Sequence, residues 1–190
     1  MTVRAVIRLA AASRRLPSRR FLRRSFCSTL ARFLLALAVL ALPLGAHAQV
    51  GRATGLPLPR FVSLNADQVN LRVGPGEDHP IAWILAREGL PVEIVEEFDT
   101  WRQVRLHDGE QGWIHSSLLS SQRTILVVDQ IRALRQAPDP SARAVLRAEP
   151  GVIGELLDCA GSWCRAEIAG RRGWLQREDF WGTLPDEEVR

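Results

Sequence analysis

The feature that most constrains the fold of this chain is an internal repeat with an offset of about 62 residues. The matched segments, first copy against second, are Leu71-Arg72 with Leu134-Arg135, Gly74-Pro75 with Ala137-Pro138, Trp101 with Trp163, and Gly112-Trp113-Ile114 with Gly173-Trp174-Leu175. Each copy spans about 60 residues, near the lower limit for a domain that folds alone. We therefore expect mutual packing of the copies, or a disulfide bond, to help stabilise them.

Short strand-like segments fill the first copy. They run over residues 69–73, 91–98, 101–106 and 111–115, and Gly, Pro and Asp residues separate them. Strands at this spacing, without any stretch of sustained helical periodicity, are typical of a small all-β barrel or sandwich.

Two repeated pairs carry further expectations about the strands. Alternation along a strand places the leucine of each Leu-Arg pair inward, so we expect Arg72 and Arg135 to lie on the solvated surface. Gly112 and Gly173 each precede a tryptophan inside a strand, which predicts a kink where the strand bends.

Together these elements resemble the bacterial SH3-like (SH3b) domains found in short exported proteobacterial proteins. The resemblance rests on Val69-Asn-Leu-Arg-Val-Gly-Pro-Gly76, a turn at Gly89, Phe98-Asp-Thr-Trp101, and Gly109 followed by Gly112-Trp113-Ile114. It implies an all-β protein with two tandem small SH3-like β-barrels. The first copy covers residues 60–121 and the second, which is degenerate, covers residues 125–182.

The remaining segments complete the expected organisation. We expect residues 1–48 to be a signal peptide. Residues 49–59 are rich in Gly and Pro, which predicts a linker, and we expect residues 183–190 to form an acidic tail. In the second copy, Ala137-Pro138-Asp139 stands where the first copy has Gly-Pro-Gly.

The leader has the composition of an export signal. It contains nine arginines and no acidic residue, followed by the apolar run Phe33–Leu42 and the small-residue site Ala46-His47-Ala48. The apolar run is shorter than the ~20 residues that span a bilayer, so we expect cleavage after Ala48; an uncleaved anchor is the alternative. Paired arginines leave the choice between the general and twin-arginine export routes open.

The charge of the chain is divided unevenly. The formal net charge of the whole chain is +4. Nine of the 25 basic residues lie in the leader, so the remainder contains 16 basic residues and all 21 acidic residues. The mature chain therefore carries a charge of about −5, which argues against nucleic-acid binding. We expect a periplasmic or secreted protein, with no nucleic-acid partner and no membrane attachment in its mature form.

The cysteines predict one disulfide bond. Cys27 precedes the apolar run and leaves with the leader, while Cys159 and Cys164 remain as a pair in an oxidising compartment. If Gly161-Ser162 is a two-residue turn, the two cysteines face each other across a hairpin. A reactive or metal-binding pair is the alternative, but the pair has no nearby histidine. The equivalent pair in the first copy, Glu97 and Arg102, predicts an ion pair of little energetic value if exposed.

The chain contains six tryptophans and no tyrosine, so its candidate aromatic binding residues are mainly tryptophans. SH3-like folds bind extended peptides in aromatic grooves, but the absence of tyrosine argues against the usual proline-rich recognition. The resemblance to bacterial members implies cell-wall peptide or protein partners instead. We expect a groove in the first copy formed by Trp83, Phe98, Trp101 and His79, with core packing as the alternative role for Trp101.

Catalytic signatures are missing from the sequence. His79, His107 and His115 have no recognisable nucleophile context, and His79 follows Glu77-Asp78 in what we expect to be an exposed polar turn rather than a metal site. No phosphate-binding glycine loop is present. We expect no enzymatic activity, no metal and no cofactor. The predicted function is a binding or targeting module for peptidoglycan or an envelope protein; the alternative is a structural accessory subunit of a periplasmic complex.

The leader generates a direct prediction. When the full chain is expressed in a host that exports it, we expect the mature protein to begin at Gln49. Intact-mass measurement checks this expectation, and a mature protein that retains residues 1–48 would instead favour the uncleaved anchor.

Overall fold

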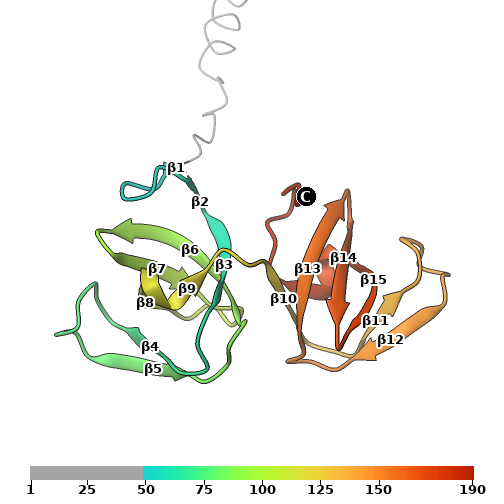
Figure 1. The fold of residues 1–190 in the computed structure, drawn as a ribbon, viewed down its shortest axis with the longest axis horizontal. Coiled ribbons are helices and arrows are strands. Elements are labelled where there is room, and N and C mark those ends of the chain that lie inside the picture. The colour runs from blue at the N-terminus through green and yellow to red at the C-terminus, as the bar shows by residue number, and fades with distance from the viewer. Residues whose placement is uncertain (1–48) are drawn as a thin grey trace, which may run out of the picture. The chain divides into compact units, whose positions relative to one another are not determined.

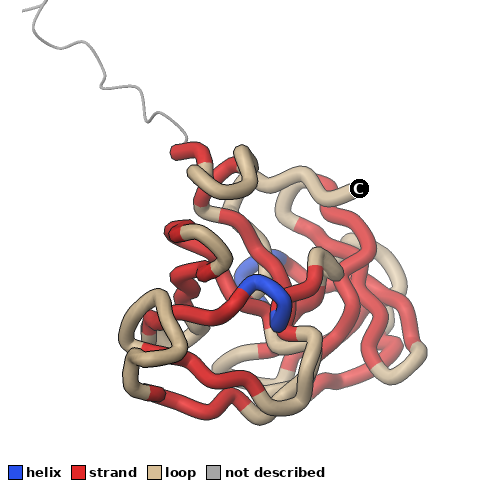
Figure 2. The backbone as a smooth tube through the Cα atoms, turned by 60° about the vertical axis from the view of Figure 1, so that its left-hand side comes forward, coloured by secondary structure: helices blue, strands red, loops and turns tan. Residues whose placement is uncertain are grey.

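The computed structural model describes residues 49–190, so the predicted signal peptide and its cleavage site at Ala48 lie outside the described residues (Figure 1). Almost all regular structure in this part of the chain is β-strand, with two short 3-10 helices (Figure 2). The expected all-β class is therefore confirmed. Within residues 49–190, no helix is long and apolar enough to cross a membrane.

The first copy forms one antiparallel sheet with strand order β5-β4-β8-β7-β6-β3-β9. Its elements are β3 (Arg60–Leu64), β4 (Val69–Arg72), β5 (Ile81–Leu85), β6 (Pro91–Phe98), β7 (Trp101–Arg105), β8 (Gln111–His115), the 3-10 helix η1 (Ser116–Leu118) and β9 (Leu119–Ser120).

The second copy repeats this topology in the order β12-β11-β15-β14-β13-β10-β16. Its elements are β10 (Thr124–Val127), β11 (Arg132–Arg135), β12 (Ala144–Ala148), β13 (Ile153–Ala160), β14 (Trp163–Ile168), β15 (Arg171–Gln176), the 3-10 helix η2 (Arg177–Asp179) and β16 (Phe180–Trp181). In the described residues no strand pairing joins the two edge strands of either sheet, so closure into a barrel stays a prediction.

Each sheet buries its own apolar core. Leu71, Val104 and Ile114 are fully buried in the first copy, and Leu134 and Leu175 are fully buried in the second. The repeat thus places leucine at the same core position of β4 and β11, as the alternation of the Leu-Arg pairs predicts.

The repeated Gly-Trp step has a packing reason that the sequence did not reveal. A Cβ on Gly112 would lie 2.8 Å from the Arg72 carbonyl oxygen and 2.6 Å from Leu71 Cγ. At Gly173 it would lie 2.7 Å from the Arg135 carbonyl oxygen. Glycine is therefore needed because β4 and β11 pass close to the strands that contain these positions.

The hairpin of β13 and β14 carries the expected disulfide bond. Cys159 pairs with Cys164 in the antiparallel register and the two are covalently joined, with their Cα atoms 4.0 Å apart. Ala160 and Trp163 form the last pair before the turn, as the two-residue turn predicts.

Residues 49–59, which we expected to form a linker, fold into a small hairpin. Its strands are β1 (Gln49–Val50) and β2 (Pro57–Leu58), which pair antiparallel. Leu58 is buried in the first core. The hairpin contacts β6, whose last residues extend beyond the pairing with β3.

The carboxylate of Glu97 holds this hairpin in place. It accepts hydrogen bonds from the backbone N–H groups of Ala53 and Thr54 (3.0 and 2.9 Å), from the Thr54 hydroxyl (2.7 Å) and from Arg60 Nη2 (2.6 Å). Arg102 Nε lies 3.5 Å away, so the predicted Glu97–Arg102 pair exists. The expectation that this pair would matter little if exposed does not apply, because Glu97 is buried and has several partners.

Residues 183–190 pack against the second copy. The Cys159 N–H donates to the Val189 carbonyl oxygen (3.0 Å), and Val189 is buried against the second core. Glu187 pairs with Arg123, whose Nη2 lies 2.9 Å from Glu187 Oε2. Burial raises the pKa of Glu187, but the hydrogen bonds from Arg123 and from the Leu184 N–H outweigh it and hold the pKa below its ordinary value.

Acid should release the hairpin of residues 49–59. Burial acts to raise the pKa of Glu97, but hydrogen bonds from Thr54, Arg60 and Ala53 prevail and lower it from 4.5 to about 2. The stabilisation from this carboxylate is therefore complete above pH 4.5 and is lost as the pH falls from 4.5 towards 2. We expect the protection factors of the Ala53 and Thr54 amides, which correct the exchange rate measured by NMR for its intrinsic pH dependence, to fall over that window.

Two matched variants distinguish the contribution of the Glu97 carboxylate to stability from that of the neighbouring Glu96 carboxylate. Glu97→Gln leaves buried arginines without their charge partner, and we expect it to destabilise the first copy by about 3 kcal/mol. Glu96→Gln removes an exposed carboxylate one residue away and should change the free energy of unfolding by less than about 0.5 kcal/mol. Equal effects of the two substitutions in urea unfolding would contradict the role of Glu97.

Candidate functional site

Large apolar side chains, together called the apolar patch here, are exposed on both faces of the arm of the first copy formed by β4, β5 and their connecting loop. Trp83 is 54% exposed, and Val73, Ile81 and Ile84 are exposed with it. Large apolar side chains gathered on one element of a soluble protein are typical of a binding surface. Trp83, predicted as a groove residue, therefore lies in a position where it can contact a ligand.

A second aromatic group lies on the hairpin of β6 and β7. Phe98 is 58% exposed and pairs with Trp101 at the end of the hairpin. The half-buried Trp101 ring meets the ring of His115 edge to face, with centroids 5.4 Å apart. The Nδ1 atom of His115 and the hydroxyl of Ser117 lie 2.7 Å apart, which orients the imidazole. Sequence reasoning placed Trp101 here but missed His115, although strand register pairs the two residues.

His79 has a packing role in the loop between β4 and β5. Its ring lies over Gly74, where an added Cβ would be 2.7 Å from the imidazole carbons. Arg72 closes the same loop, because its Nη1 donates to the His79 carbonyl oxygen at 2.7 Å. Arg72 is thus half-buried and hydrogen-bonded, not simply solvated as expected from the sequence.

The second copy keeps this loop and changes the pair of residues that pack in it. Arg135 Nη1 donates to the Ala142 carbonyl oxygen at 2.8 Å, which is the equivalent of the Arg72 contact. Ala142 occupies the position of His79, and Ala137 occupies the position of Gly74. The missing glycine of the degenerate copy is therefore explained, because no ring covers Ala137 in that loop.

The structure brings some of the predicted groove residues together. Phe98 and Trp101 are neighbours, and Trp101 shares its face of the sheet with His115. The register pairs Trp83 with the buried Leu71 across β4 and β5, and Trp83 is nevertheless 54% exposed because it lies on the outer strand of that arm. His79 is held in the loop by Gly74 and Arg72.

A polar pocket of about 290 Å³ occupies the corresponding region of the second copy. Its lining residues come from β11, β12, β14, β15, η2 and the loops on either side of β11. They are Ile131, Arg132, Ala133, Arg135, Pro140, Arg147, Trp163, Gln176 and Asp179. Trp163 is the counterpart of Trp101, and Gln176, which pairs with it, is the counterpart of His115.

The turn end of the hairpin that carries Trp163 is tied in two ways. The disulfide bond between Cys159 and Cys164 joins the strands next to Trp163. At the tip, the Arg177 backbone N–H donates to the Ser162 carbonyl oxygen (3.0 Å) and its Nε donates to the Gly161 carbonyl oxygen (2.9 Å). These contacts fix the aromatic wall of the pocket.

The charged side chains of the pocket are mostly cationic. Arg132 Nη1 lies 2.7 Å from Asp179 Oδ1, and the buried Nε of Arg132 has no hydrogen-bond partner. Arg135 and Arg147 have no carboxylate within ion-pair distance among the described residues. Asp139 lies nearby, but hydrogen bonds from Ser141 lower the pKa of its carboxyl, with a smaller contribution from the charge of Arg135.

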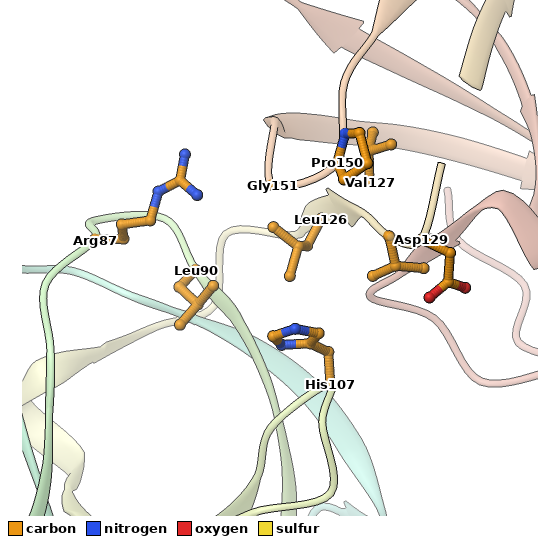
Figure 3. A pocket seen from close by; sticks show the side chains of 9 residues that line it. Arg87, Leu90, His107, Leu126, Val127, Asp129, Pro150 and Gly151 are labelled. Carbon is orange, nitrogen blue, oxygen red and sulfur yellow. The ribbon is translucent and has the colours of Figure 1, made fainter. Parts of the chain in front are cut away.

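A further hollow, of about 350 Å³, is lined by residues of both copies (Figure 3). Leu90, Leu126 and the ring of His107 surround it, whereas the guanidinium of Arg87 and the carboxylate of Asp129 lie at opposite ends. Specific small-molecule sites combine an apolar wall with convergent polar groups, which this hollow lacks. In residues 49–190, no group of three or more His, Cys, Asp or Glu side chains is placed to hold a metal ion.

Comparison with known proteins identifies relatives of both copies. A family model described as "Bacterial SH3 domain" matches residues 65–121 and again residues 128–182. The putative N-acetylmuramoyl-L-alanine amidase YrvJ of Bacillus subtilis (strain 168) is 25% identical over 145 residues, which cover 66% of this chain. The chain spans only 28% of the length of that relative.

Two solved structures match part of the chain at 14% sequence identity. NlpC2 from Trichomonas vaginalis matches with a TM-score of 0.32 over 69% of this chain and 51% of that protein. An NlpC/P60 family protein from Bacillus cereus ATCC 10987 matches with a TM-score of 0.30 over 65% of this chain and 57% of that protein.

The loop pair at Gly74 and His79 generates a reciprocal mutational test. Gly74→Ala pushes a methyl group against the imidazole and should destabilise the first copy by about 1–3 kcal/mol in urea unfolding. Adding His79→Ala recreates the alanine pair of the second copy and should restore much of that loss. If the two substitutions are simply additive, the proposed contact between the side chains is wrong.

Proposed function

Because the chain belongs to the bacterial SH3 domain family, we propose that it is a non-catalytic binding module of the cell envelope, with a ligand in peptidoglycan or in an envelope protein. The observation that carries this proposal is the family match to both copies, together with the similarity to a putative wall amidase over 145 residues. The chain spans 28% of the length of the amidase relative, so the similarity covers only a part of that protein.

The placement of the reactive side chains supports a non-catalytic role. His79 packs on Gly74, and His115 pairs with Trp101 and Ser117, so the two histidines serve separate local contacts. Cys159 and Cys164 are joined in a disulfide bond and offer no thiolate nucleophile. Export to the periplasm or to the outside of the cell belongs to the same proposal, since the leader has the composition of a signal peptide.

The exposed aromatic groups of the first copy provide the ligand-binding surface in this proposal. Phe98 and Trp101 form one edge of the face and His115 adds a hydrogen-bonding ring. Rigid aromatic side chains contribute contact area at a small entropic cost, which suits binding of a short peptide. Closure of each sheet into an SH3-like barrel belongs to the same proposal.

One observation favours a second candidate function. The apolar patch of Val73, Ile81, Trp83 and Ile84 is exposed on β5 and the adjoining loop, and such patches bind protein surfaces. The chain would then serve as a structural accessory subunit of an envelope complex without a small ligand.

A sedimentation assay on purified peptidoglycan sacculi tests the first proposal. We expect the mature protein to be retained and its tryptophan fluorescence to change. Trp101→Ala should weaken retention at least tenfold, because aromatic anchors at binding surfaces contribute about 2 kcal/mol or more.

Two controls interpret the result. Leu56→Ala removes another exposed apolar side chain, on the hairpin of residues 49–59, and should leave retention unchanged. Trp83→Ala tests whether the apolar patch takes part. Absence of retention for the unaltered protein would reject the wall-ligand proposal, and crosslinking dependent on Trp83 would then favour the accessory-subunit role.

A further inference from the structure

The polar pocket of the second copy differs from the equivalent region of the first copy at three charged positions. Strand register equates Arg132 with Val69, because they pair with Ala148 and Leu85 at the same place in the two sheets. By the same register, Arg147 is equivalent to Ile84. Asp179, the last residue of η2, is equivalent to Leu118, the last residue of η1.

The fold does not require the three charged residues. The first copy forms the same seven-stranded topology with Val69, Ile84 and Leu118 at these positions. Burying part of an arginine is costly, and Arg132 keeps a buried Nε without a hydrogen-bond partner. Asp179 compensates the charge of Arg132 at 2.7 Å, whereas Arg147 has no carboxylate within ion-pair distance among residues 49–190, so its charge is available to a ligand of opposite sign.

The pocket carries an excess of positive charge in an otherwise acidic molecule. Three arginines line it against the single carboxylate of Asp179, whereas residues 49–190 as a whole contain 16 arginines and 21 acidic residues. The side chain of Arg147 makes no hydrogen bond or ion pair to the described residues, so its guanidinium can turn to a ligand. Arginine recognises carboxylates through two parallel hydrogen bonds, and it does so best where water is partly excluded.

The volume of the pocket and its uncharged lining residues indicate which class of anion it can bind. A pocket of about 290 Å³ holds the end of a short peptide and not an extended polyanion, which the net negative charge of the chain would also repel. Trp163 offers an apolar face for a small side chain next to the charged group. Gln176 can both donate to and accept from a peptide amide, and Asp179 can accept from an N–H group.

We propose that the pocket formed by Arg132, Arg135, Arg147 and Trp163 binds the free carboxylate end of a short peptide. The carboxylate pairs with Arg147 and with the open side of Arg132 or Arg135, and the terminal side chain packs on Trp163. This inference rests on the proposed function, in that a cell-wall peptide is the source of such an end. It assigns the carboxylate to the second copy, while the aromatic face of the first copy is a separate surface.

The test uses protein purified after expression of the full 190-residue chain. The probe is N-acetyl-D-alanyl-D-alanine, which has a free carboxylate and a terminal methyl side chain, and the comparison probe is the same dipeptide as its C-terminal amide. Binding is followed by NMR titration of the tryptophan indole N–H signals. We expect the Trp163 signal to shift with the acid, and the amide to bind at least tenfold more weakly.

Two arginine substitutions form a matched pair for this titration. Arg147→Ala removes a pocket arginine that makes no contact needed for folding, and affinity for the acid should fall about tenfold or more. Arg143→Ala removes an exposed arginine just before the same strand, outside the pocket, and should leave affinity unchanged. Because both lower the net charge by one, a general electrostatic effect would weaken binding equally in the two variants and would overturn the proposal. Arg147→Lys should recover only part of the affinity, since lysine keeps the charge but not the forked geometry.

The outcomes separate this inference from the proposed function. If sacculi retain the protein and its Arg147→Ala variant equally, and the dipeptide acid does not bind, the carboxylate site is wrong while the wall-binding role stands. If the dipeptide acid binds and its affinity depends on Arg147, but sacculi do not retain the protein, the carboxylate site stands and the wall-binding role is wrong. Equal binding of the acid and the amide would also overturn the carboxylate site.

Discussion

The close approach of two neighbouring strands at the Gly-Trp step is the constraint on which each sheet depends. At Gly112 the missing side chain lets β4 place Leu71 in the core and bring the Arg72 carbonyl within van der Waals contact. Gly173 does the same for β11 and Leu134. A methyl group at either glycine would separate the strands and displace a core leucine. The arms β4–β5 and β11–β12, which carry the exposed binding residues, therefore take their positions from two glycines.

The two copies use this common scaffold to display different chemistry. In the first copy, the arm presents Trp83 and neighbouring apolar side chains, and the hairpin of β6 and β7 presents Phe98 beside the half-buried Trp101. In the second copy, arginines such as Arg147 replace the apolar side chains, and Trp163 forms one wall of a polar pocket. Such a division is possible because strand pairing and the buried leucines set the sheet, while outward-facing positions are free to change. One chain thereby offers an aromatic surface and a cationic pocket.

Local patterns in the sequence were sufficient to predict the all-β class, the two copies and the disulfide pair. Each depends on residues close together in the chain: strand alternation, turn residues, and the two-residue turn that sets Cys159 opposite Cys164. Candidate site residues were predicted less completely. Trp101 and Phe98 do lie together, because they share one hairpin. His79 was predicted as a groove residue; its ring lies over Gly74 in its own loop, and its contact with a ligand stays a prediction.

Contacts between distant segments were decided only by the tertiary structure. Glu97 is buried because Thr54 and Arg60, which lie 43 and 37 residues earlier, converge on its carboxylate, and no local pattern marks that meeting. The cationic pocket likewise assembles Arg147 and Trp163 from strands that are not paired with each other. Repetition and alternation are visible along a chain, so they specify the sheets. Which side chains share a pocket depends on how strands order themselves across the sheet, and that order comes from packing of the whole core.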